Sequence, residues 1–378
     1  MEILTIIIFL LIIGAVIFIH EFGHFLAAKL SNVKVEEFSI GFPPVIFQKK
    51  KGETVYSLGL IPLGGFNKIY GMDEINDSDE KSVQDERSYR SQSFIVKLFI
   101  ILAGVIMNFL LASLIFYFVL FKSNFEFLQP LIFSDYQFPI GSQKNVPVIG
   151  AVSDSSPAKD ILLPQDVILK VNGEEITSAV QFQKLIEENK GQQIVLEVKN
   201  LQSKEIRTVS VVSRQVYPEN EGPLGVAFSE CAYLNYGSSA FSKIASGFSH
   251  TYNLTHFTFV TLGDLISYSI QEKNGEALAS SFIGPVGIFA VTKITVEEGF
   301  LAVLNLLAII SLGLGAANLL PIPGLDGGKT LFLCIESFNK KFTPKIQAQI
   351  ENYGMIFIIL LAIFLIVKDF IQFKEIIF

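Results

Sequence analysis

Residues 3–28 read ILTIIIFLLIIGAVIFIHEFGHFLAA, an apolar run with two histidines and a glutamate near its end. A helix needs about 20 mostly apolar residues to cross the hydrocarbon core of a bilayer, and this run is long enough. Residues 94–121, 300–320 and 353–373 meet the same criterion. Half of the chain is apolar, and the mean hydropathy of +0.48 is high for a soluble protein of this length. We therefore predict a polytopic α-helical membrane protein with about four transmembrane helices.

The first run could instead be a secretory signal peptide. Signal peptides have a basic amino-terminal region and a small-residue cleavage site. The chain begins Met1-Glu2 and carries His20, Glu21 and His24 in the far part of the run, so we favour a transmembrane helix.

Charge and cysteine content argue against a nucleic-acid-binding protein and against a disulfide-stabilised fold. The formal net charge is −7 and Lys and Arg are scattered among acids, so we expect no nucleic-acid partner. The only two cysteines, Cys231 and Cys334, fall on opposite sides of the membrane in the topology below and predict no disulfide.

Basic residues beside the spans predict the orientation, because cytosolic loops carry an excess of Lys and Arg. Such residues flank the loops 29–93 and 321–352: Lys29, Lys34, Arg87, Arg90, Lys97, Lys329, Lys340, Lys341 and Lys345. We expect both loops in the cytosol and residues 122–299 outside it. No Arg- and Ser-rich transit peptide is visible, which favours a bacterial inner (plasma) membrane over an organelle.

The pattern His20-Glu21-Phe22-Gly23-His24 is an H-E-x-x-H sequence. On a helix, its two imidazoles project from one face and can bind one metal ion together. Zinc accepts imidazole ligands and lowers the pKa of its bound water to about 7, and Glu21 would then accept a proton from that water. The alternative is that these residues only form hydrogen bonds between helices or reach the interface. Ionisable residues inside a span favour a functional site.

A third ligand is expected from residues 318–328, NLLPIPGLDGG. Pro321 and Pro323 must open the helix, and irregular backbone at membrane depth is tolerated only around a protein-lined or water-filled site. Asp326 can therefore complete the zinc shell, although an ordinary helix exit with Asp326 in cytosolic water is the alternative. Asn318 could donate to the substrate backbone or a developing oxyanion, or serve as a contact between helices.

The remaining spans are interpreted as scaffold. Gly104, Asn108 and Ala112 repeat every four residues, as do Gly313 and Ala317, which is typical of close helix packing. Residues 353–373 have almost no polar group in the middle of the run and are interpreted as an anchor.

Taken together, these residues resemble the site-2 protease family of intramembrane zinc metalloproteases, in particular its regulator of sigma-E protease branch. The resemblance includes H-E-x-x-H at 20–24, Gly104-x-x-x-Asn108, and the Asn-x-x-Pro-x-Pro-x-x-Asp-Gly run at 318–327. It implies that His20, His24 and Asp326 bind Zn²⁺, that Glu21 is the catalytic base and that Asn318 lies near the substrate.

The first cytosolic loop resembles the family's membrane-associated loop at residues 61–66, IPLGGF. Residues 54–60 alternate like a strand, whose exposed edge could receive an unwound substrate by strand addition. The alternative is an amphipathic hairpin lying on the headgroups. Residues 73–90 are charged and polar and predict a solvated linker.

Residues 146–213 resemble one extracytoplasmic α+β PDZ domain. Strands are expected at 167–171, 194–198 and 208–212 and a helix at 180–188. The usual alanine-glycine is missing from its first motif and Gln165 replaces a glycine, so peptide capture and a size-excluding cap both remain open. Within the linker 214–299, residues 236–268 predict an amphipathic surface helix. His250 and His256 there lie on different helix faces and are poor ligand candidates.

The expected organisation is an N-terminal membrane half (1–121), the PDZ domain, the linker, and a C-terminal membrane half (300–378). The expected activity is zinc-dependent hydrolysis of peptide bonds within or near transmembrane segments of single-span proteins. Anti-sigma factors and remnant signal peptides are the substrate types, cleaved in regulated intramembrane proteolysis. A non-catalytic PDZ-bearing scaffold is the alternative. A transporter would need repeated halves, which the sequence does not show.

Overall fold

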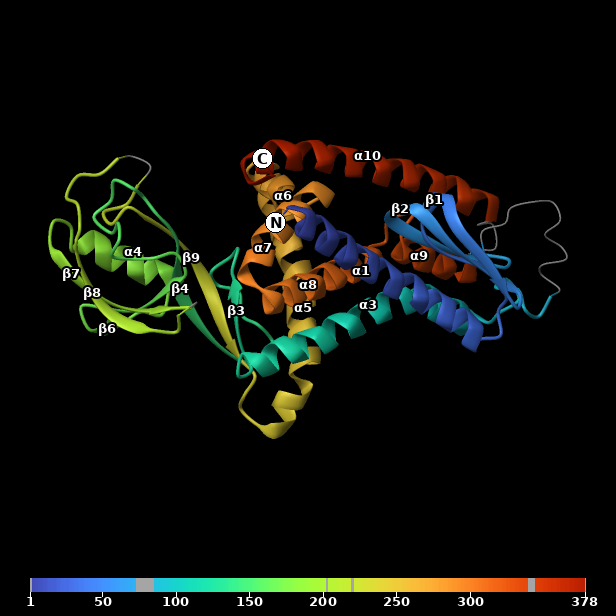
Figure 1. The fold of residues 1–378 in the computed structure, drawn as a ribbon, viewed down its shortest axis with the longest axis horizontal. Helices are drawn as coiled ribbons and strands as arrows, with labels where there is room; N and C mark the ends of the chain where they lie inside the picture. The colour runs from blue at the N-terminus through green and yellow to red at the C-terminus, as the bar shows by residue number, and fades with distance from the viewer. Residues whose placement is uncertain (1, 73–84, 202, 219–220, 339–343, 378) are drawn as a thin grey trace. The chain divides into compact units, whose positions relative to one another are not determined.

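The computed structural model describes residues 2–72, 85–201, 203–218, 221–338 and 344–377 (Figure 1). Most of the linker predicted at 73–90 lies outside the described residues. The chain forms two compact units. Unit 1 comprises residues 1–119, 250–255 and 262–378, and unit 2 comprises residues 120–249 and 256–261.

Four helices are long and apolar enough to cross a membrane, as expected from the sequence. They are α1 (Glu2–Leu30), α3 (Phe94–Lys122), α8 (Phe300–Leu319) and residues 346–374 of α10 (Pro344–Ile377). The fourth helix begins nine residues before the predicted 353, because its first turns are polar and hydropathy alone does not detect them.

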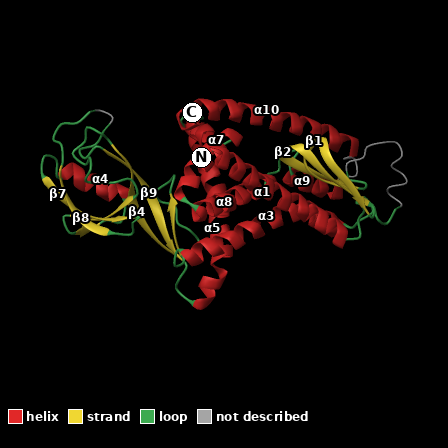
Figure 2. Cartoon of the chain, in the orientation of Figure 1, coloured by secondary structure: helices red, strands yellow, loops and turns green. Residues whose placement is uncertain are grey.

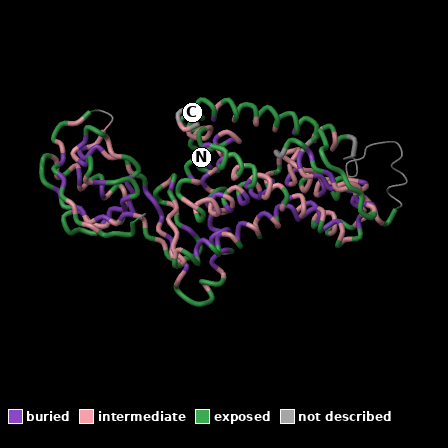
Figure 3. Tube along the Cα trace, in the orientation of Figure 1, coloured by how far each residue is buried: buried purple, intermediate pink, exposed green. Residues whose placement is uncertain are grey.

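Apolar side chains cover the outside of these helices. Along α10, Phe357, Leu360 and Phe364 are all more than half exposed, and much of the helix is drawn as exposed in Figure 3. A helix in water would bury such residues, so this surface suits contact with lipid. The short helices α6 (Glu276–Ser281), α7 (Pro285–Glu298) and α9 (Asp326–Phe338) complete unit 1, and α7 contacts α1, α8 and α10.

Unit 1 also contains a sheet made of two long, bent strands, β1 (Val35–Lys51) and β2 (Thr54–Ile69). Residues 37–40 pair on one side with 55–58 and on the other with 65–68, and residues 45–51 pair with the far side of 54–59. The segment 54–59 therefore has neighbours on both sides. Our expectation of an exposed edge at 54–60 is wrong, and the outer segments are 45–51 and 61–69.

Unit 2 is built on an antiparallel sheet with the order β3-β9-β4-β5-β7-β8, and β6 pairs with β5. Figure 2 draws the strands in yellow. The strands are β3 (Glu126–Pro130), β4 (Ser142–Val152), β5 (Asp166–Val171), β6 (Glu174–Glu175), β7 (Gln193–Asn200), β8 (Ile206–Val212) and β9 (Val226–Asn235). Helix α4 (Ala179–Glu188) contributes Phe182 and Ile186 to the core beside Ile168 and Leu196.

The three strands and the helix expected between 167 and 212 are present within two residues at each end. The sheet also includes β3 and β9, which lie outside the predicted range 146–213. The amphipathic helix expected at 236–268 is α5 (Ala240–Gln271), which contributes residues to both units.

Candidate metal centre

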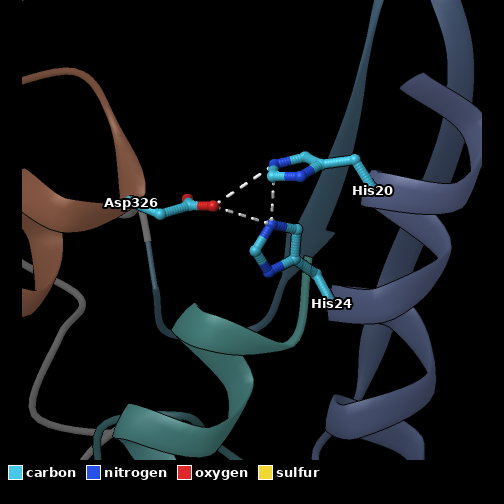
Figure 4. Close-up of side chains that lie close together, drawn as sticks. All are labelled: His20, His24 and Asp326. Atoms are coloured by element: carbon cyan, nitrogen blue, oxygen red, sulfur yellow. Dashed lines mark hydrogen bonds and ion pairs between the residues drawn. The ribbon is translucent and has the colours of Figure 1, made fainter. Parts of the chain in front are cut away.

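Helix α1 brings two imidazoles together. His20 and His24 are one turn apart, both are buried, and their Nε2 atoms are 3.3 Å apart (Figure 4). The neighbouring helix α3 can approach only because it has no side chain at Gly104. A Cβ atom there would lie 2.4 Å from His24 Nε2. Gly23 has the same role on α1, because its Cβ would lie 2.4 Å from the carbonyl oxygen of Ala103.

Asp326 is the first residue of α9 and points at both imidazoles (Figure 4). The chain leaves α8 at Leu319, passes through Pro321 and Pro323, and re-enters a helix at Asp326. This tight turn requires glycine at 327 and 328, where a Cβ atom would lie 2.3 Å from backbone carbonyl oxygens. The Asp326 side chain is only 13% exposed, so it does not lie in open water as an ordinary helix exit would place it.

The three side chains have the spacing that zinc requires. Asp326 Oδ2 lies 3.2 Å from His20 Nε2 and 3.2 Å from His24 Nε2, and the third side of the triangle is 3.3 Å. Tetrahedral zinc with ligand bonds of about 2.0–2.1 Å separates its ligand atoms by roughly 3.3 Å. Among the described residues this is the one group of three metal-ligating side chains found close together.

The ionisation of Asp326 also suits a cation. Burial raises the pKa of the Asp326 carboxyl, but hydrogen bonding and charge interaction with the His20 and His24 side chains lower it by more, so the net pKa lies below its usual range. Asp326 is therefore ionised at neutral pH. His24 Nδ1 lies 2.9 Å from the carbonyl oxygen of Ile100, which accepts the ring proton and leaves Nε2 as the ligand atom.

Glu21 faces the sheet of unit 1. Asn67 Nδ2 donates to Glu21 Oε2 at 2.7 Å and to its backbone oxygen at 2.8 Å. A Cβ atom at Gly65 would lie 2.9 Å from Glu21 Cγ, so the glycine permits this close approach. Asn318 is buried in the last turn of α8, and within the described part of the chain no hydrogen bond of its side chain identifies a role.

Three contacts of the centre were not anticipated from the sequence: those of Asn67, Asn108 and the Ile100 carbonyl. Asn108 Nδ2 lies 3.3 Å from His20 Nδ1, although the Gly-x-x-x-Asn pattern was interpreted first as a packing face. A polar residue one turn after a glycine in an apolar helix was the available signal. His250 and His256 lie outside the cluster. His250 packs on Phe116, and His256 Nδ1 is 2.7 Å from the Tyr136 hydroxyl oxygen.

Comparisons with known proteins agree with this chemistry. The profile of peptidase family M50 matches residues 8–362. A protein of Clostridium acetobutylicum named as a zinc metalloprotease is 31% identical, over 98% of this chain and 98% of the relative. The regulator of sigma-W protease RasP of Bacillus subtilis is 27% identical, over 95% of this chain and 96% of its own length. The chain therefore belongs to peptidase family M50 and is a membrane-associated zinc metalloendopeptidase.

Proposed function

We propose that the protein cleaves peptide bonds within or near the transmembrane segments of single-span membrane proteins, in regulated intramembrane proteolysis of the site-2 type. The observation that carries this proposal is the location of the ligand cluster. His20 and His24 lie in an apolar helix with a mean hydropathy of 3.0 over an 18-residue window. Asp326 comes seven residues after the end of α8, another helix that is long and apolar enough to span a membrane. Soluble substrates would not need a site built on such helices.

His20, His24 and Asp326 would hold the zinc ion through Nε2, Nε2 and Oδ2. Zinc with three protein ligands keeps a fourth position for water, lowers the pKa of that water and polarises a carbonyl. Glu21 would take the proton of the attacking water and deliver it to the leaving amine. Asn318 is the candidate donor to the developing oxyanion.

The substrate must be extended before cleavage, because a helix keeps its peptide bonds inside its own hydrogen bonds. We place strand addition at the outer segment 61–69 of β2. Among the described strands this segment is paired on one side only, and its Asn67 contacts Glu21 directly. An extended peptide along 61–69 would therefore lie beside the catalytic base.

Unit 2 would be a PDZ domain that selects substrates. Support comes from a cavity of about 500 Å³ between α4 and the start of β9, lined by Phe182, Ile186, Gly225, Val226 and Phe228 among others. Residues 226–229 pair with β4 on one side, whereas β3 pairs only with 231–235, so the described strands leave the other edge of 226–229 open. An open strand edge beside a helix suits capture of an extended peptide. It therefore favours peptide capture over a cap that only excludes large substrates.

The protein would span a bacterial inner membrane several times, with the metal centre near the cytosolic face and unit 2 outside. The cationic residues bordering loops 29–93 and 321–352 support this orientation. The lipid bilayer and single-span substrates are its expected partners.

The decisive test uses purified protein in liposomes with doubly tagged single-span probes, one derived from an anti-sigma factor and one from a signal peptide. Wild-type protein should cut at least one probe within or next to its transmembrane segment. Glu21→Gln should retain zinc and probe binding but lose cleavage by at least about 100-fold. Cleavage that survives in Glu21→Gln, or zinc-loaded wild-type protein that cuts soluble peptides but neither probe, would overturn the proposal. Cleavage by Glu21→Gln would indicate that another residue is the base. Cleavage of soluble peptides alone would indicate a peptidase that acts on soluble substrates.

A further inference from the structure

Asn108 lies in the interior of α3 and is fully buried. Its side-chain amide is 3.3 Å from His20 Nδ1, and its Oδ1 atom has no hydrogen-bond partner among the described residues. Its position is held from a second helix, because Ser311 Oγ of α8 donates to the Asn108 backbone oxygen at 3.0 Å. Gly104, one turn earlier, leaves room for both imidazoles. The Gly-x-x-x-Asn pattern thus contacts both histidines of the metal centre.

A histidine that binds zinc through Nε2 must carry its single ring proton on Nδ1. That proton needs an acceptor, which fixes both the tautomer and the ring orientation. For His24 the acceptor is the Ile100 carbonyl, at 2.9 Å. For His20 the Asn108 amide is the group at hydrogen-bond distance from Nδ1.

An asparagine amide can serve this purpose in either of two orientations. A half-turn about its Cβ–Cγ bond exchanges oxygen and nitrogen without changing the shape of the group. In one orientation Nδ2 donates to an unprotonated Nδ1. In the other, Oδ1 accepts the Nδ1 proton and acquires the partner that it otherwise lacks.

We propose that Asn108 is the positioning residue of His20, accepting the Nδ1 proton through Oδ1 so that Nε2 is free to bind zinc. This inference rests on the proposed zinc ligation by His20. Helix α3 then supplies an acceptor to each histidine, a side-chain oxygen to His20 and a backbone oxygen to His24. The pattern interpreted from the sequence as a packing face would be a support for the metal ligands.

The test compares Asn108→Leu, which removes the acceptor, with Asn108→Asp, which keeps a carboxyl oxygen in the same place. Asn305→Leu on α8 is the matched control, because it also replaces an asparagine whose Oδ1 lacks a partner. Zinc affinity is measured by competition with a chromophoric chelator, and the melting midpoint is measured on zinc-stripped protein. Asn108→Leu should weaken zinc binding about 10- to 100-fold. The zinc affinities of Asn108→Asp and Asn305→Leu should lie within a few-fold of the wild-type value.

Wild-type zinc affinity in Asn108→Leu, or an equally weak Asn108→Asp variant, would overturn the inference. If Asn108→Leu does not accumulate, two other measurements test the inference. They are the zinc affinity of Asn108→Asp and nitrogen-15 NMR of histidine-labelled, zinc-loaded wild-type protein. His20 must show a protonated Nδ1, whose signal shifts in Asn108→Asp, and an unprotonated Nδ1 contradicts the inference. A His20→Ala variant separates the two proposals. If it binds zinc like wild type, the ligand set itself is wrong. If it loses zinc while Asn108→Leu keeps it, only the role of Asn108 fails.

Discussion

Asn67 holds Glu21 at two points, because the same Nδ2 group lies 2.7 Å from the carboxylate oxygen and 2.8 Å from the backbone oxygen of that residue. Asn67 belongs to β2 and Glu21 to α1, so the sheet of unit 1 and the first helix meet at the candidate base. The sheet therefore contributes directly to the site. It fixes the orientation of a group on which proton transfer would depend.

Replacing Asn67 by alanine should reduce kcat roughly 10- to 100-fold, because a misplaced general base loses its alignment with the reacting atoms. Zinc content should stay at the wild-type level, since Asn67 does not contact His20, His24 or Asp326 in any hydrogen bond of the described residues. The measurement is single-turnover cleavage of a reconstituted single-span probe, with zinc determined on the same sample. An unchanged kcat would show that Glu21 is positioned without Asn67.

The sequence was sufficient to predict the four apolar helices and the elements of the small sheet, because each is a local pattern of hydropathy or alternation. It was also sufficient to suggest that His20, His24 and Asp326 meet, since i,i+4 spacing and a helix broken by Pro321 and Pro323 are readable from residue types. Contacts between segments that are distant in the sequence could not be predicted from residue types and spacing. Asn67 reaches Glu21 across 46 positions, and Asn108 reaches His20 across 88.

Two interpretations of the scaffold were wrong. The segment 54–60 alternates like an edge strand, yet the bent partners place neighbours on both of its sides. Gly313 was expected to pack closely. A Cβ atom there would meet no described residue within 4 Å beyond its own helix turns, and the close approach is made by Gly315 against Asn108 and Phe109. Spacing identifies candidates for close packing, whereas the rotation of each helix selects between them.

Gly104→Ala should abolish zinc binding or weaken it by at least about tenfold. Its new methyl group would lie 2.4 Å from His24 Nε2 and 2.8 Å from His20 Cε1, so the imidazoles must move. Gly313→Ala is the matched control, because it adds the same methyl group where there is open space. Zinc affinity by chelator competition distinguishes them. Equal affinities in both variants would mean that α3 does not constrain the histidines.

The outer segment 61–69 should contact an extended substrate. A photo-crosslinking residue at Phe66, introduced into the Glu21→Gln variant, should capture a bound single-span probe next to its cleavage site. Phe47 is the control, because it lies on the opposite outer segment of the same sheet. Crosslinking is read by mass spectrometry of the joined peptides. Efficient capture from Phe47 and none from Phe66 would place the substrate on the other edge.

Asp369 gives the fourth helix a role beyond anchoring. Its Oδ2 accepts hydrogen bonds from the backbone N–H groups of Gly284 and Gly287, both at 2.8 Å, and so joins α10 to the start of α7. Asp369→Leu should leave these donors unpartnered, at a cost of about 1–3 kcal/mol each, and lower the melting midpoint. Asp369→Asn keeps an acceptor oxygen, so its melting midpoint should fall less than that of Asp369→Leu. An Asn variant as unstable as the Leu variant would show that charge, not acceptance, stabilises the junction.

The central claim is that His20, His24 and Asp326 bind one zinc ion. Zinc K-edge X-ray absorption of the purified wild-type protein tests it most directly. We predict one zinc per chain with only nitrogen and oxygen ligands at about 2.0–2.1 Å, and a scattering pattern that requires two imidazoles. A sulfur ligand, or a spectrum with no imidazole, would contradict the account.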